Sequence, residues 1–280
     1  MSRRKLREKI FHFFAFSFSW LSVLVLLLLV WSILRDGLHV LKPHFFTSFP
    51  SRFAAKAGIY APLIGSLWVM TLTAIISIPI GVSTALYFEE YAPKNRFADL
   101  LQINIATLAG MPAIIYGLMS LAVFVRYLGF ERSVLSASLC MSLLVLPTII
   151  IAAQGSIRAV PINLREAAFA LGARRYQVVF GQVLPAAVPG IMTGIILALS
   201  RAMGEAAPLI LLGALSYVAF VPKSIMDSYT VLPVQIFNWV GRPQEAFHDL
   251  AAGAIIVLIV FLFALNFGAV IIRSRFQRYK

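Results

Sequence analysis

One arginine and one glutamate stand in a stretch where ionised side chains are unexpected. Residues 197–208 carry no other charge, and Arg201 precedes Glu205 by four positions. On a regular helix this spacing places both side chains on one face, so the two charges can pair. A guanidinium presents a planar fork of donors that fits the oxygens of phosphate or a similar oxyanion. The pair therefore indicates anion chemistry.

The composition places this stretch inside a membrane. Sixty per cent of the 280 residues are hydrophobic and only 12% are charged, far from the usage of soluble domains. Apolar runs of about 18 residues or more indicate membrane spans. We predict an all-α polytopic membrane protein with six transmembrane helices, of which the fifth begins near Pro189. The predicted spans are 13–34, 57–88, 100–125, 133–157, 189–214 and 250–272.

An arginine near the middle of the fifth predicted span needs an explanation. A charge at the bilayer centre costs about 2.5–3.5 kcal/mol on insertion scales. One interpretation is a structural ion pair that locks this helix to a neighbour. Because intramembrane charges by default mark substrate or ion pathways, we predict that Arg201 and Glu205 line a translocation pathway. Glu205 would orient Arg201 and partly neutralise it, so that an anion is passed on and not trapped.

Three helix breaks are expected near this pathway. A proline frees a backbone carbonyl, which in a membrane must find a protein partner or a water-lined cavity. Packing kinks use the same residues, so the breaks alone do not decide between structure and function. The residues are Pro112, Gly204 and Pro208.

The placement of cations predicts the orientation in the membrane. Fifteen of the 24 Lys and Arg residues lie in the two terminal segments, the second-to-third loop and the fourth-to-fifth loop. The positive-inside rule therefore places both termini in the cytoplasm. The net charge of +13 is explained by this bias and by anionic lipid, without nucleic acid. The first apolar run is longer than a cleaved signal core, so we expect a retained helix.

The cytoplasmic loop 154–188 is amphipathic. Asn163 is a good N-cap, and Glu166 follows three residues later as in a capping box. Gly172 can adopt a left-handed conformation and end the helix. Composition alone favours a surface helix in the lipid headgroup region. The expected apolar face consists of Leu164, Ala167, Ala168 and Leu171.

The same loop resembles a known docking element. Glu166-Ala167-Ala168, then Gly172, then Leu184-Pro185 match the coupling ("EAA") loop of import-type permeases of ATP-binding-cassette (ABC) transporters, although Gln182 replaces the usual aliphatic residue. Further stretches resemble the PstA-type phosphate permeases, with Ser66 and Ala113 in place of the expected Thr and Ser. These stretches are 61–91, 108–118, 200–208 and 232–236, and the resemblance covers about residues 57–272.

The resemblance implies a type I ABC importer permease fold in the bacterial inner membrane. Residues 1–56 would form a cytoplasmic leader, the first helix and an outward loop, and residues 57–280 the permease domain. It implies that phosphate is moved by alternating access, driven by ATP. The implied partners are a second, similar permease in a heterodimer, a homodimeric ATPase and an extracytoplasmic phosphate-binding protein. Glu166, Ala167, Ala168 and Gly172 would contact the ATPase.

No residues in the chain indicate its own enzyme chemistry. The phosphate-loop pattern G-x-x-x-x-G-K-[ST] is absent from the sequence, so we expect ATP and magnesium on the partner ATPase and no cofactor here. The lone Cys140 and four scattered histidines provide no ligand spacing for a metal. We therefore predict a transport subunit without catalytic residues.

Three alternatives remain open. The substrate could be another solute, such as the oxyanions molybdate or sulfate. A secondary transporter or channel would predict internal inverted repeats, and the sequence has no convincing repeat. A membrane-embedded enzyme has the weakest support, because the predicted spans contain neither paired carboxylates nor a Ser/His arrangement.

Overall fold

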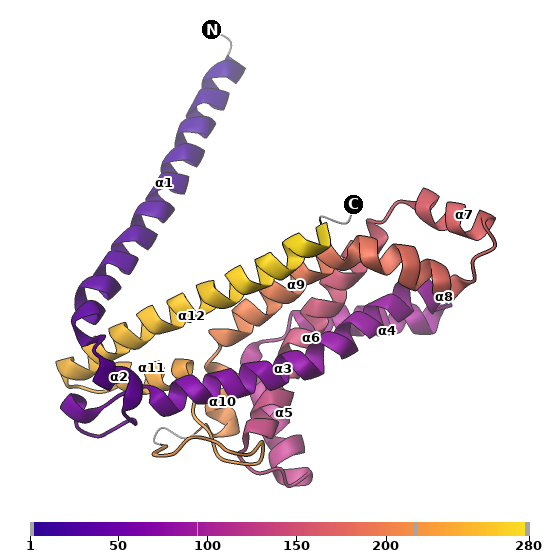
Figure 1. Ribbon diagram of the computed structural model, residues 1–280. Coiled ribbons are helices and arrows are strands. Elements are labelled where there is room, and N and C mark those ends of the chain that lie inside the picture. The colour runs from indigo at the N-terminus through magenta and orange to yellow at the C-terminus, as the bar shows by residue number, and fades with distance from the viewer. Residues whose placement is uncertain (1–2, 94, 215–217, 278–280) are drawn as a thin grey trace.

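The computed structural model describes residues 3–93, 95–214 and 218–277, and within these ranges it is helical (Figure 1). Lys94, Arg278 and Lys280, which contribute to the predicted charge bias, lie outside them. The long helices are α1 (Arg3–Gly37), α3 (Tyr60–Leu86), α4 (Arg96–Ala109), α6 (Val134–Arg158), α9 (Leu184–Met203) and α12 (Glu245–Gln277). The shorter ones are α2 (Pro43–Thr47), α5 (Ala113–Ser120), α7 (Ile162–Ala170), α8 (Arg175–Val178), α10 (Ala207–Leu212) and α11 (Leu232–Val240). Three π-helical segments, η3 (Tyr87–Tyr91), η4 (Leu121–Tyr127) and η5 (Val179–Val183), extend these helices.

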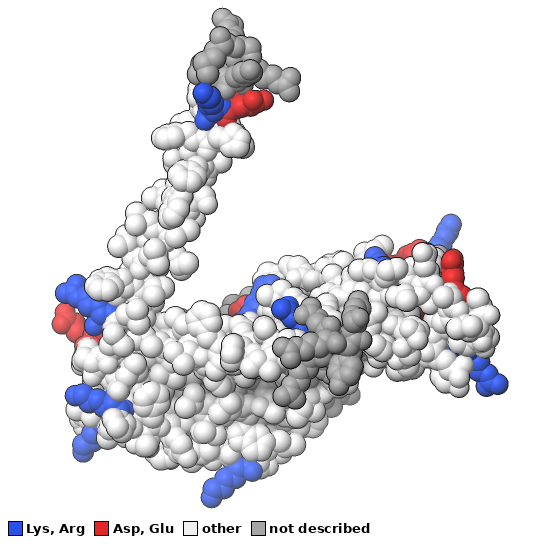
Figure 2. All heavy atoms as spheres, turned by 45° about the horizontal axis from the view of Figure 1, so that its top comes forward, with Lys and Arg blue, Asp and Glu red and all other residues white. Residues whose placement is uncertain are grey.

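Five of the described helices are long and apolar enough to cross a membrane, and a bent pair supplies a sixth span. The five lie where the first, second, fourth, fifth and sixth spans were predicted. Figure 2 shows that most of the visible face of the body carries no charged side chains, with many of the charges near its ends. This distribution is the one expected for helices surrounded by hydrocarbon.

The third span is not the single helix that we predicted. Residues 96–109 and 113–127 form two helices that meet at an angle of 104°. Gly110 ends α4, and Pro112, with φ −56° and ψ 134°, is extended before α5 begins. Proline lacks an N–H and disfavours helical geometry in the residue before it, so the chain turns here.

The predicted limits of the fifth span are wrong at both ends. The helix begins at Leu184, before Pro189, and is continuous with η5. Pro185 lies inside the continuous helix from Arg175 to Met203, just after the π-helical turn of η5. At the other end α9 stops at Met203, with Gly204 as the C-cap, and α10 starts at Ala207.

The core is formed by α3, α6 and α9, which pack side by side. Hydrogen bonds between α3 and α6 accompany this packing. Thr73 Oγ1 donates to the carbonyl of Ser138 at 3.3 Å, and Ser142 Oγ donates to the carbonyl of Thr73 at 3.4 Å. Gly194 of α9 faces Ala152 of α6 so closely that a Cβ would lie 2.3 Å from the alanine methyl. Small residues thus let these helices approach closely, as is usual in membranes.

Helix α1 stands apart from this core. Figure 1 shows it diverging from α12 toward the N-terminus. None of its most apolar 18-residue window is buried. The two helices meet near Gly37, where a Cβ would lie 2.7 Å from the backbone of Ala252 and Gly253. A helix that is apolar on every side needs lipid or another protein chain around it.

We predict that Gly65→Ala destabilises the fold. A Cβ at Gly65 of α3 would lie 2.0 Å from the carbonyl oxygen of Thr230, a backbone atom that cannot rotate away. Overpacking of this kind costs about 1–3 kcal/mol, so the thermal unfolding temperature of the purified protein should fall. Gly155→Ala in α6 is the control, because no atom lies within 4 Å of its Cβ position. Equal unfolding temperatures for the two variants would contradict this packing.

Candidate functional site

Arg201 and Glu205 lie on either side of a helix end. Arg201 is in the last turn of α9, and Glu205 follows the C-cap Gly204 in the link to α10. The Arg201 Nε and Glu205 Oε1 atoms are 3.8 Å apart, which is an ion pair but longer than a hydrogen bond. The pairing was predicted correctly, whereas its location on one continuous helix was not. A cation in the last turn is also favoured by the helix dipole.

The guanidinium of Arg201 is not enclosed by this chain. Its side chain is 70% exposed, compared with 24% for Glu205. Leu197, one turn earlier on α9, is 65% exposed, so the surface around the arginine is apolar. A charge on an apolar membrane surface is costly unless a polar partner or water covers it. The described residues therefore form only one side of this site.

A small cavity lies behind the arginine, between α4, α5, α6 and α9. It has a volume of about 20 Å³, which suits a single water molecule. Its lining includes Thr148 and Tyr116, two polar residues that the sequence analysis missed. Tyr116 Oη donates a 2.7 Å hydrogen bond to the carbonyl of Leu108, in the last turn of α4. The same carbonyl accepts from the N–H of Met111 at 3.0 Å, so the tyrosine adds a second hydrogen bond at the end of α4.

The predicted breaks are all at helix ends, and two of the broken spans pack together. Pro112 is the N-cap of α5, and Pro208 lies in the first turn of α10. A Cβ on Gly117 of α5 would lie 2.5 Å from the carbonyl oxygen of Pro208. The bend of the third span is therefore in direct contact with the break in the fifth, next to the Arg201–Glu205 pair.

The loop 154–188 contains α7, which lies with α8 at one end of the molecule (Figure 1). Glu166 and Ala167 are exposed, and Ala168 is half-buried against the core. Gly172 has φ +80°, and the predicted end of the helix at this glycine is confirmed. Its N–H bonds the carbonyl of Phe169 at 2.9 Å, and the next N–H bonds that of Ala168 at 3.1 Å. These two bonds form a Schellman motif.

The predicted N-cap of this helix is wrong. Pro161, not Asn163, is the N-cap, and no side chain caps the helix. The extended backbone at Pro161, with ψ 137°, lets the helix begin at Ile162, so Asn163 is already inside the first turn. A proline just before the helical turns is pre-organised for this geometry.

Several large apolar side chains of the loop are exposed. Exposed apolar surface of this kind serves contact with another protein or with the membrane. Leu171 is 89% exposed and is the most exposed of them. The others are Ile162, Leu164, Phe169, Tyr176 and Phe180.

The sequence analysis also missed two ion pairs beneath the loop. Arg165 pairs with Glu90, and Arg158 pairs with Glu89. The available signal was the two consecutive glutamates just after the second predicted span, together with the arginines of the loop 154–188.

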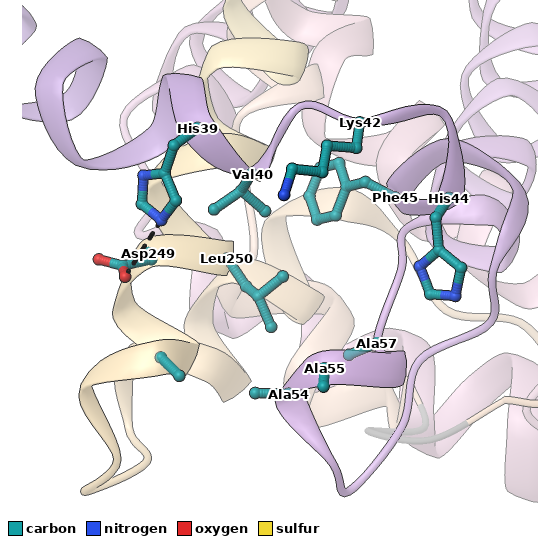
Figure 3. Close-up of a pocket in the computed structure, with 11 residues that line it drawn as sticks. His39, Val40, Lys42, His44, Phe45, Ala54, Ala55, Ala57, Asp249 and Leu250 are labelled. Atoms are coloured by element: carbon teal, nitrogen blue, oxygen red, sulfur yellow. Dashed lines mark ion pairs between the residues drawn. The ribbon is translucent and has the colours of Figure 1, made fainter.

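A further pocket lies elsewhere and contains none of the predicted site residues (Figure 3). It has a volume of about 450 Å³ and is formed by the segment after α1 and the start of α12. His39 Nε2 lies 3.5 Å from Asp249 Oδ2, and their side chains are 62% and 41% exposed. Lys42 and His44 also line it. Because water competes for these exposed groups, the pocket holds a small ion less firmly than an enclosed site would.

We predict that Gly172→Ala loosens the end of α7. The left-handed conformation at this position costs a residue with a Cβ about 1–2 kcal/mol. Amide hydrogen exchange in residues 168–173 should therefore become faster, as measured by mass spectrometry. Gly181→Ala is the control, since Gly181 has no positive φ and no atom within 4 Å of its Cβ position. Unchanged exchange in the Gly172 variant would contradict the Schellman motif.

The sequence was compared with known families and proteins. The family described as "Binding-protein-dependent transport system inner membrane component" matches residues 77–278. A "Phosphate transport system permease protein PstA 1" of Mycobacterium tuberculosis (strain CDC 1551 / Oshkosh) is 30% identical over 277 residues, which cover 97% of this chain and 90% of that protein. A PstA protein of Haemophilus influenzae is 32% identical over 252 residues, covering 89% and 88% of the two chains.

A solved structure supports the fold. A bacterial ABC transporter involved in the import of the acidic polysaccharide alginate contains a chain that matches with a TM-score of 0.66 and 16% identity, covering 97% of this chain and 99% of that one. The predicted type I ABC importer permease fold is thereby confirmed, while the cytoplasmic location of the termini stays a prediction. The chain belongs to the family of binding-protein-dependent transport-system inner-membrane components and is a multi-pass membrane protein.

Proposed function

We propose that this chain is the permease subunit of an ATP-driven importer that moves inorganic phosphate across the bacterial inner membrane. Its relatives are named phosphate transport permeases, and they match nearly the whole chain. The observation that carries the proposal is the position of Arg201, an exposed guanidinium at a helix end where two broken spans meet. A planar donor fork at such a point suits a phosphate oxyanion.

The pathway lies along the exposed side of Arg201. Because the cavity behind the arginine holds only about one water, the anion passes in front of it. A second, homologous permease supplies the opposite wall, so that the site is completed in a heterodimer. Glu205, 3.8 Å from the guanidinium, orients it and repels the anion. This repulsion keeps binding weak enough for release.

The loop 154–188 couples the permease to a homodimeric ATPase in the cytoplasm, on the side where both termini lie. The exposed Glu166 and Ala167 and the half-buried Ala168 present α7 to a groove on that subunit, as in helix-in-groove recognition. Gly172 sets the direction in which the chain leaves the groove. ATP and magnesium bind to the ATPase, and an extracytoplasmic phosphate-binding protein delivers the substrate from the opposite side.

The movement is an alternating access of packed helices. Closure of the ATPase dimer on ATP pulls the two coupling helices together and opens the pathway outward. Hydrolysis then resets the pathway inward. Residues 57–280 form the moving permease domain, and residues 1–56 supply the cytoplasmic leader, the first helix and the outward loop.

We predict that Arg201→Gln abolishes phosphate uptake while the complex still assembles. Loss of a charge that pairs directly with an anion costs about 2–5 kcal/mol, so uptake should fall by a factor of about 30 or more. The measurement is uptake of radiolabelled phosphate into proteoliposomes that contain both permeases and the ATPase, supplied with the binding protein and ATP.

Two controls define the result. Glu205→Gln keeps the guanidinium, so it should retain binding and slow release, with a smaller loss of uptake than Arg201→Gln. Excess sulfate or molybdate should not compete with phosphate in the wild-type complex. Wild-type uptake by Arg201→Gln would exclude the proposed role, and transport of sulfate or molybdate in place of phosphate would exclude the proposed substrate.

A further inference from the structure

The guanidinium of Arg165 joins three elements on the cytoplasmic side. Its Nε and Nη2 atoms donate to Glu90 Oε1 at 3.2 and 2.9 Å. Its Nη1 donates to the carbonyl of Val160 at 2.7 Å, and Nη2 also donates to the carbonyl of Ile157 at 2.9 Å. These bonds connect α7, which carries the arginine, to η3 at the end of α3 and to the end of α6.

This cluster is shielded from water. The side chains of Arg165 and Glu90 are 20% and 11% exposed, so their hydrogen bonds are less screened than those of a surface pair. The adjacent pair is different, because Arg158 is 59% exposed although it lies 2.7 Å from Glu89. The two pairs thus have the same chemistry, a similar location and similarly enclosed glutamates, but their arginines differ in burial.

Arg165 also completes the end of α6. The carbonyl of Ile157, at the end of α6, accepts from the N–H of Val160 at 3.2 Å as well as from Arg165. Val160 lies in the short link between α6 and α7, and its carbonyl accepts from Arg165 at 2.7 Å. A cation at this end is favoured by the dipole of α6. A guanidinium has five donors in a planar fork and can therefore bind all three partners at once. A lysine ammonium is a compact point charge and does not present such a fork.

The ends of α7 leave it few other constraints. Pro161 precedes it with an extended backbone, and the left-handed Gly172 follows it, so the chain bends at both ends. The main packing contacts of α7 are with α8 and η5. Its neighbour in sequence, Glu166, is exposed on the outer side. Besides the short link from α6 and the packing of Ala168 against the core, the polar bonds through Arg165 connect α7 to the α3–α6 pair.

We propose that Arg165 is a positioning residue that transmits the displacement of α7 to α3 and α6, with Glu90 as its partner. This inference rests on the proposed function, in which α7 is moved by an ATPase. A force on α7 acts through one guanidinium on both helices together. Because α3 and α6 are hydrogen-bonded through Thr73 and Ser138, they respond as one body.

The test is the coupling ratio, phosphate transported per ATP hydrolysed, in the reconstituted complex of both permeases, the ATPase and the phosphate-binding protein. Arg165→Gln should leave the stimulated ATP hydrolysis within about twofold of wild type. The coupling ratio should fall about tenfold, since ATP is still consumed while the movement is lost. A merely stabilising residue would lower both activities in parallel.

Arg158→Gln is the matched control. It removes the same group from the neighbouring exposed pair, so its coupling ratio should stay within about twofold of wild type. Arg165→Lys keeps the charge but not the fork and should lower the ratio about threefold. Wild-type coupling in Arg165→Gln or Arg165→Lys, or equal losses in Arg165→Gln and Arg158→Gln, would overturn the proposal.

Glu90→Gln keeps the test decisive if Arg165→Gln does not assemble. It leaves the arginine and its bonds to the carbonyls of Ile157 and Val160 in place and weakens only the link to α3. We expect a coupling ratio about threefold below wild type with normal assembly. A wild-type ratio would overturn the proposal. If the wild-type complex itself transports no phosphate, the proposed function fails, whereas a transporting wild type with unaffected variants refutes only the role of Arg165.

Discussion

In a hydrocarbon environment every backbone polar group and every charge needs a partner within the protein or in enclosed water, and this constraint explains the architecture of the candidate site. The third span is bent by 104° at Pro112, and the fifth ends at Met203 shortly before α10. Helices α5 and α10, which follow these two points, pack against each other at Gly117 and Pro208. Tyr116 donates to a carbonyl in the last turn of α4, and Arg201 lies at the carboxyl end of α9. The bend at Pro112 and the link between α9 and α10 lie close together, so their polar groups can find partners within the protein. In the proposed function, an anion meets polar groups at this same location.

The two arginines at the centre of the account differ in what surrounds them. Arg165 is largely enclosed, and four hydrogen bonds hold its guanidinium within this chain. Arg201 is largely exposed, and its one ion-pair partner is 3.8 Å away. The first arrangement fixes a position and suits the transmission of force. The second leaves donors free for a ligand or for a partner subunit, which suits transient binding.

Much of the fold was predictable because long apolar runs report membrane helices directly. The five straight spans and the end of α7 at Gly172 follow from local composition and backbone preference. The 104° bend at Pro112 did not follow, since a proline in an apolar run is compatible with both a kink and a break. The early start of α9 was missed because the span was expected to begin near Pro189, whereas the helix continues into it from η5 through Pro185.

The candidate site was only partly predictable for a different reason. The pairing of Arg201 with Glu205 is local in sequence, whereas Arg165 and Glu90 are 75 residues apart and meet only through the packing of α3 with α6. Tyr116 and Thr148 likewise gain their meaning from the helices that bring them to the arginine. The importance of the cytoplasmic loop came from its resemblance to a known docking element, because composition alone favoured a helix at the lipid surface.

The central claim is that position 201 faces an aqueous anion pathway in the assembled transporter. The most direct measurement is the reactivity of Arg201→Cys, in a background with the buried Cys140 replaced by serine, toward a small, charged thiol reagent that does not cross membranes. The account predicts modification of position 201 in the assembled, ATP-cycling complex and no modification of the equivalent variant at Ala198, which is buried on the same helix. A cysteine at position 201 that reacts only with lipid-soluble reagents would place this side chain in the bilayer and contradict the account.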